Sequence, residues 1–170
     1  QYYLKNEQRS GERTYSVKYD SLYNMSWDTE YVVYCFGMDD EGEQTAYVVV
    51  EEFRTEAPVP TSNTFTITIG ETTKTSVEFT VEPTTDDPYY VTIETVDVLA
   101  PYGPDKEQSY EDMVRYLTPE YDMTIEQRTF TGKQTITNSD LGKSVNGFKT
   151  YRVVVWGFEN GPTTTVFMSE

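Results

Sequence analysis

Neighbouring carboxylates are the residue pattern in this sequence that is best suited to acid–base chemistry. Examples are Asp39-Asp40, Glu51-Glu52 and Asp86-Asp87. Glycoside hydrolysis needs two acids about 5 to 10 Å apart across a cleft, a geometry that adjacent loop residues seldom supply. The chain has no histidine, which excludes Ser-His-Asp and Cys-His catalysis and histidine-ligated zinc. We therefore expect solvated surface carboxylates and no enzymatic activity.

The acidic turn after the strand that begins at Tyr31 has the composition of a cation site. Asp39, Asp40 and Glu41 precede Gly42, and carboxylate oxygens around a bend are what Ca²⁺ requires. The spacing of an established calcium loop is absent. We predict a hairpin turn with Gly42 at positive φ and no cofactor, and calcium at the three carboxylates is the alternative.

Aromatic side chains are the better functional lead, because they make up 15% of the chain and 15 of them are tyrosines. Tyrosine combines a flat apolar ring with a polar tip, which suits binding surfaces. Such surfaces would take a surface glycan or an extracellular protein. The alternative is that these rings fill cores, since tyrosine favours strands. The candidate ligand-binding aromatics are Trp27, Tyr23, Tyr89, Tyr102 and Tyr110.

The charge balance excludes several partners. Thirteen basic against 29 acidic side chains give a net charge of −16, which repels nucleic acid and anionic lipid. No apolar run approaches the ~20 residues of a membrane-spanning helix. The single cysteine, Cys35, excludes an intrachain disulfide, and its place in an apolar strand predicts a small buried residue.

The elements that would position these residues are mostly strands. Residues 64–69 and 76–82 alternate apolar and polar side chains and predict a hairpin, and residues 89–99 predict a central strand. The further strands are expected at 128–137, 150–158 and 163–168. Ser109 and Asp112 form a capping-box pattern that predicts one short helix over 109–117. The sequence thus predicts an all-β Greek-key sandwich with one helical insertion.

Two segments of the chain repeat one another. Tyr31–Asp39 corresponds to Tyr151–Glu159, and Gly11–Val17 corresponds to Gly132–Asn138. Repeats indicate related structural units. We expect residues 1–56 to be the C-terminal part of one sandwich, 57–61 to be a linker, and 62–170 to be a complete sandwich. Strands upstream of Gln1, or a strand from a partner, would have to complete the first unit.

These motifs resemble a known family. Thr29-Glu30-Tyr31, Gly37 with its acidic turn, and Phe53-Arg54-Thr55 resemble the end of a fibronectin type III domain, and residues 62–170 resemble a whole one. With the helical insertion, the chain is similar to the tandem fibronectin-like, immunoglobulin-like modules of uncharacterised Bacteroidetes surface lipoproteins. The resemblance implies a structural role for Tyr31 and Tyr151, which would be buried with their hydroxyls bonded to nearby backbone.

The resemblance also implies where the protein works. It would be an extracytoplasmic module at the cell surface or outer membrane, held by a lipid anchor outside the given chain. Such a module would act in adhesion, in glycan or protein binding, or as a spacer. The alternative is an accessory domain of a secreted glycan- or protein-degrading enzyme whose catalytic part lies upstream.

Overall fold

The computed structural model describes residues 10–12, 14, 25–118 and 122–170. The chain divides into two units, residues 1–56 and 57–170. Tyr23 lies outside the described residues, so its predicted role has no structural counterpart here.

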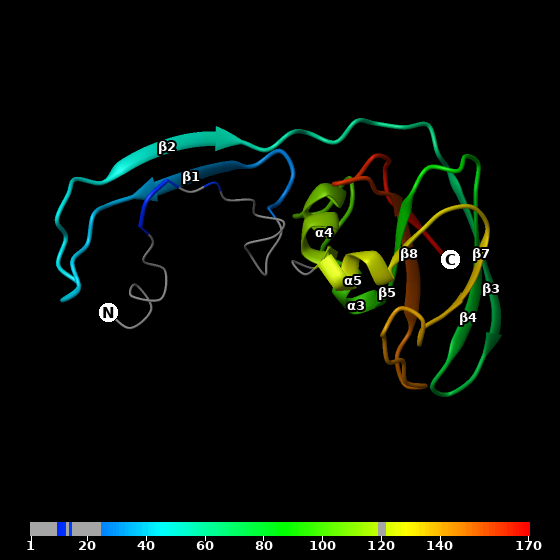
Figure 1. Ribbon diagram of the computed structural model, residues 1–170. Helices are drawn as coiled ribbons and strands as arrows, with labels where there is room; N and C mark the ends of the chain where they lie inside the picture. Colours follow the sequence, from blue (N-terminus) through cyan, green and yellow to red (C-terminus); the bar gives the residue numbers. More distant parts are fainter. Residues whose placement is uncertain (1–9, 13, 15–24, 119–121) are drawn as a thin grey trace. The chain divides into compact units, whose positions relative to one another are not determined.

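The second unit consists of two antiparallel sheets with strand orders β3-β4-β7 and β6-β5-β8-β9 (Figure 1). Its strands are β3 (Phe65–Thr72), β4 (Val77–Pro83), β5 (Tyr89–Thr95), β6 (Thr129–Phe130), β7 (Gln134–Thr137), β8 (Tyr151–Gly157) and β9 (Phe167–Met168). The described part of the chain is therefore mostly antiparallel strand, and the all-β class is confirmed. The predicted hairpin is β3–β4.

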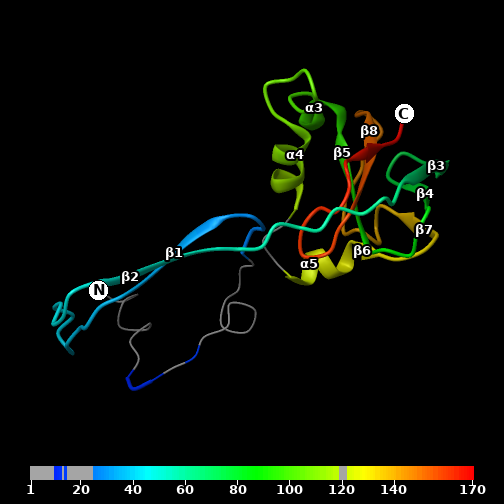
Figure 2. The same ribbon diagram turned by 90° about the horizontal axis from the view of Figure 1, so that it is seen from above.

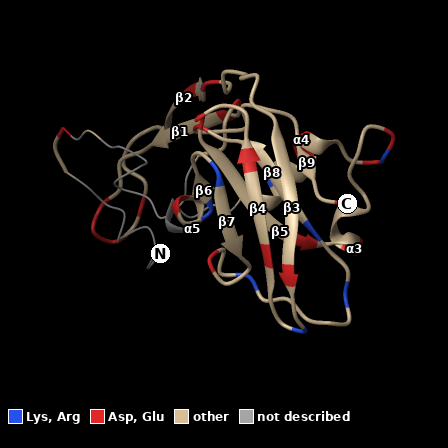
Figure 3. Ribbon diagram, turned by 90° about the vertical axis from the view of Figure 1, so that its right-hand side faces the viewer, with Lys and Arg blue, Asp and Glu red and all other residues tan. Residues whose placement is uncertain are grey.

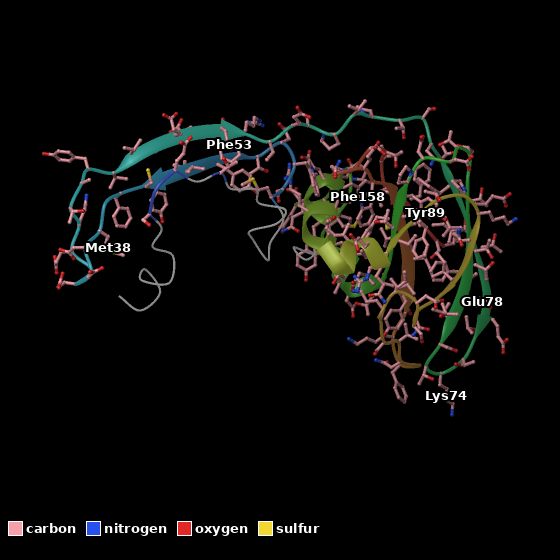
Figure 4. The ribbon with its side chains drawn as sticks, in the orientation of Figure 1. Met38, Phe53, Lys74, Glu78, Tyr89 and Phe158 are labelled. Atoms are coloured by element: carbon pink, nitrogen blue, oxygen red, sulfur yellow. The ribbon has the colours of Figure 1, made fainter. Side chains whose placement is uncertain are left out.

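The two sheets share one hydrophobic cluster. Phe79 and Val81 contribute to it from β4, and Tyr89, Val91 and Val155 from the other sheet, all fully buried. Figure 4 shows the ring of Tyr89 between the sheets. Side chains alternate along the strands, so every second one lies in this layer, apart from a register shift in β3 between Ile69 and Thr72. The core of the second unit therefore follows directly from the sequence pattern.

The described part of the second unit also has three helices, namely α3 (Val96–Leu99), α4 (Tyr110–Leu117) and α5 (Asp122–Gln127). The expected helix is α4, and its capping box with Ser109 and Asp112 is present. The predicted strand over 89–99 is wrong beyond Thr95, where α3 begins. None of the described helices is long and apolar enough to cross a membrane.

The helices lie on the outer face of the β5–β8 sheet, away from β3, β4 and β7 (Figure 2). Met113, Val114 and Leu117 are the buried residues of α4. On the sheet, the Tyr90 ring lies 4.8 Å from the ring of Trp156. This sheet is therefore covered on both faces, which explains why five consecutive residues of β8 are buried.

The first unit has one described sheet, a two-stranded antiparallel ribbon of β1 (Glu30–Cys35) and β2 (Val49–Arg54) (Figure 1). Every residue of the ribbon except Tyr31 is exposed. The prediction that Cys35 is buried is therefore wrong. Its strand has the sequence pattern of a covered strand, but no second layer covers it among the described residues.

Candidate functional site

The ribbon of the first unit has the same pairing as the β8–β9 hairpin of the second. An isolated antiparallel bridge joins Met38 to Gln44, and its counterpart joins Phe158 to Pro162. Figure 4 shows Met38 at the turn end of the ribbon. The sequence repeat is thus also a structural repeat, with a longer turn in the first unit.

A glycine ends the apolar run in both hairpins. The backbone N–H of Thr45 donates to the carbonyl of Gly37 at 2.8 Å, and that of Thr163 donates to Gly157 at 2.7 Å. At either glycine, an added Cβ would collide with the threonine side chain. Both turns therefore require glycine because two backbone segments approach closely.

A tyrosine is bonded in the same way at the start of both hairpins. The hydroxyl of Tyr31 accepts from the backbone N–H of Ser26 at 2.7 Å, and that of Tyr151 accepts from Asn146 at 3.2 Å. In each case the donor lies five residues earlier. The hydroxyl bonds implied by the resemblance are present, although both tyrosines are half-buried instead of buried.

The two hairpins differ at one edge. In the second unit, β8 lies between β5 and β9, and Thr150 accepts from Val96 on the β5 side. In the first unit, Thr29 accepts from Thr55 on the β2 side. Ladder bonds alternate in direction, so Val32 and Tyr34 turn their backbone groups to the other edge of β1. No described residue pairs with that edge.

Both faces of the ribbon carry exposed apolar side chains beside its charged ones. Their counterparts in β8, Val153, Val154 and Val155, are at most 2% exposed. Exposed apolar clusters of this kind mark interaction surfaces. We call β1–β2 with its unpaired β1 edge the open ribbon. Its exposed apolar residues are Val32 (56%), Val33 (54%), Tyr34 (65%), Val49 (57%), Val50 (51%) and Phe53 (39%).

The open ribbon lies in an acidic segment. Residues 25–56 contain nine acidic side chains and one basic side chain, Arg54. The guanidinium of Arg54 contacts Asp28 at 2.7 Å and Glu30 at 3.4 Å. The hydrogen bond to Asp28 is the main cause that raises the pKa of Arg54. The one base is thus already paired, and the surroundings of the ribbon carry negative charge.

Two of the candidate aromatics are buried. Tyr89 is fully buried, and its hydroxyl donates to the carbonyl of Gly132 at 2.7 Å. Burial raises the pKa of Tyr89 to about 12. Trp27 is 9% exposed. Neither ring is available to stack against a ligand.

The other two described candidates lie by the helical insertion. Tyr102 is half-buried and stacks on Tyr116, with ring centroids 6.1 Å apart. Tyr116 is 65% exposed. Burial is the main cause that raises the pKa of Tyr102, and the electrostatic effects of Tyr116 and Asp112 raise it further. Tyr110 is half-buried at the start of α4. Helical spacing places Tyr116 outside the face formed by Met113, Val114 and Leu117, and this is the sequence signal for its exposure.

The carboxylate pairs have structural or solvated positions. Asp39 accepts from the backbone N–H of Glu43 at 2.8 Å, and Gly42 has φ of 91°, as predicted for a hairpin turn. Glu51 and Glu52 are neighbours on β2 and so project to opposite faces. Within the described ranges, no group of three or more acidic or cysteine side chains is placed to hold a metal ion.

Comparison with known proteins finds no family model that matches the chain, and no curated protein or solved structure that is significantly similar.

Proposed function

We propose that this chain is a non-catalytic, extracytoplasmic binding module made of fibronectin type III-like sandwiches, and that its first unit captures a strand of a partner protein. The cell-surface location rests on the family resemblance. The binding mode rests on one observation: the open ribbon repeats the β8–β9 hairpin but has no counterpart of β5 among the described residues.

The repeat specifies the geometry of the missing strand. In the second unit, β5 runs antiparallel to β8, with Ile93 opposite Val153 and Val91 opposite Val155. The corresponding strand would run antiparallel to β1 and bond to Val32 and Tyr34. Strand addition of this kind draws affinity from main-chain hydrogen bonds and specificity from alternate side chains.

The charge and side chains of the ribbon favour a strand from a different protein, and not a second copy of this chain, as its partner. The occupant needs apolar residues at alternate positions, because the exposed valines and Tyr34 line the edge. Each copy has a net charge of −16, and residues 25–56 are acidic, so two ribbons repel one another. The partner strand is therefore expected to carry lysine or arginine at its outward positions.

A labelled synthetic peptide tests strand addition. The probe is the β5 sequence, residues 88–96, with Glu94→Lys and added terminal lysines, and its binding to the full chain is followed by fluorescence anisotropy. The control probe carries Tyr90→Pro and Thr92→Pro, because the N–H groups at alternate positions of β5 face β8 while that of Val91 faces β6. The first probe is expected to bind and the proline probe is not.

Two matched protein variants locate the edge. Val32→Pro removes a donor from the unpaired edge of β1, whereas Val50→Pro places proline on the outer edge of β2. The first variant is expected to weaken peptide binding by about tenfold or more, and the second by much less. Equal effects would refute addition at β1. Self-association of the wild-type chain in sedimentation, abolished by Val32→Pro, would replace the partner strand with a second copy.

A second candidate function is glycan binding at the Tyr102–Tyr116 stack, which is favoured by the exposed ring of Tyr116. Exposed tyrosine rings suit the apolar faces of sugars. Retardation in gels that contain host or plant polysaccharides, lost in Tyr116→Ala and retained in Tyr34→Ala, would support it. Absence of retardation across the panel would reject it.

A further inference from the structure

A cavity of about 280 Å³ opens at the end of the second unit where β3 turns into β4. It is lined by that turn, by the segment before β8 and by the last residues of the chain. Its apolar lining includes Val77, Ile93 and Val153, which reach it from three different strands. Small-molecule sites are typically concave, apolar and about 300 to 1,000 Å³, so this cavity, just below that range, has room only for a small ligand.

The cavity gathers positive charge in an acidic protein. Residues 57–170 contain eight basic and 17 acidic side chains. Three of the eight bases, Lys74, Lys149 and Arg152, line the cavity, together with one acid, Glu170. Figure 3 shows that lysine and arginine are sparse and that several lie at this end, and Figure 4 shows Lys74 on the β3–β4 turn. The cavity therefore differs in charge from the rest of the unit.

Lys74, Lys149 and Arg152 form no salt bridge within the described residues, and the same is true of Lys106 and Arg128 elsewhere in the unit. The ion pairs of the second unit are Arg115 with Glu111, Lys133 with Glu82, and Lys143 with Glu94. Uncompensated cations beside an apolar pocket raise the local concentration of anions.

We infer that this cavity binds a small amphipathic anion, that is, a carboxylate carried on an apolar ring or a short acyl chain. The apolar body would contact Val77, Ile93 and Val153, and the carboxylate would lie against Lys149 and Arg152 at the rim. Charge-assisted bonds to a carboxylate are about twice as strong as neutral ones, which gives the anion its advantage over a neutral analogue. The site lies wholly in the second unit and is independent of strand addition to the first.

Isothermal titration calorimetry with matched ligand pairs tests this inference. The probes are phenylacetate and hexanoate, each compared with its neutral amide, phenylacetamide and hexanamide, on the full chain. The carboxylates are expected to bind about fivefold or more tightly than the amides. Amides that bind as well as the carboxylates, or no binding by any probe, would overturn the inference.

Variants then place the binding site. Lys149→Gln and Arg152→Gln are each expected to weaken carboxylate binding by about threefold to tenfold. Lys106→Gln makes the same charge change outside the cavity and is expected to leave the affinity unchanged. Val145→Phe fills the cavity without altering charge and is expected to abolish binding, with circular dichroism as the check that it folds. Carboxylate binding that survives both charge variants would place the ligand elsewhere and refute the site.

Discussion

The β1–β2 and β8–β9 hairpins share a turn glycine, a tyrosine bond and a bridge beyond the strands, yet their side chains have opposite environments. Val153 is 2% exposed, and its counterpart Val33 is 54% exposed. Local residues are thus sufficient to set the hairpin, whereas burial depends on β5 and on the facing sheet. The open ribbon thus resembles the buried β8–β9 hairpin, but among the described residues no strand pairs with its β1 edge.

The largest contrast is expected at the aromatic position of the repeat. Trp156 is fully buried and Phe36 is half-buried. Trp156→Ala should lower the free energy of unfolding of the second unit by about 3 to 5 kcal/mol, because it leaves a core cavity. Phe36→Ala should lower it by less than about 0.5 kcal/mol. Urea unfolding followed by far-ultraviolet circular dichroism measures both, and similar losses would contradict the contrast.

Val153 and its counterpart Val33 allow the same comparison of a buried and an exposed position, with a smaller change in side-chain volume. Val153→Ala should lower the free energy of unfolding by about 2 kcal/mol, from lost transfer energy and an unfilled space. Val33→Ala should change it by less than about 0.5 kcal/mol. The two variants are compared by the shift in the urea midpoint. A large loss in Val33→Ala would mean that the ribbon face is covered in solution.

Removing the hydroxyl of Tyr31 or Tyr151 should affect local amide protection in both hairpins but global stability mainly in the second unit. Tyr151→Phe should cost about 1 kcal/mol of unfolding free energy, the net value of one hydrogen bond. Tyr31→Phe should change the global value little, because its hairpin is exposed apart from Tyr31 itself. In both variants the amide that lost its acceptor, Asn146 or Ser26, should exchange faster with solvent. An unchanged exchange rate at both amides would show that neither bond forms.

The smallest effect concerns pH and the turn after β7. The backbone N–H and the hydroxyl of Thr137 donate to Asp140, and these bonds lower the pKa of that carboxyl. A lowered folded pKa contributes stability above the unfolded pKa of about 3.9, and this contribution is lost as pH falls through the folded pKa. Asp140→Asn should therefore lose less stability between pH 7 and pH 3 than the wild-type chain in urea unfolding. If both chains lost the same unfolding free energy between pH 7 and pH 3, this prediction would be contradicted.

Secondary-structure features that are set by residues close together in the chain were predictable from the sequence. Alternation gave the β3–β4 hairpin, and Ser109 with Asp112 gave the start of α4. The helix α3 was missed because Val96 to Leu99 continues the apolar character of a strand. Leu99 is 6% exposed, and tertiary packing of this kind can override the strand propensity of a short apolar segment.

Burial at the candidate site was not predictable for the same reason. Cys35 and Val155 occupy equivalent strand positions between aromatic or apolar neighbours, and one is exposed and the other buried. Tyr89 and Tyr102 likewise have similar local sequence signals near turns. Whether each ring packs inward depends on which sheet or helix lies above it, and no local pattern carries that information.

Amide hydrogen exchange of β1 against β8, resolved by NMR, tests the central claim most directly. The amides of Val32 and Tyr34 face the unpaired edge and should exchange rapidly, while that of Val33, which bonds to β2, should be slower. Their counterparts Arg152 and Val154 face β5 and should be protected. Protection of Val32 and Tyr34 equal to that of Arg152 and Val154 would show that the edge is already paired, and would contradict strand capture.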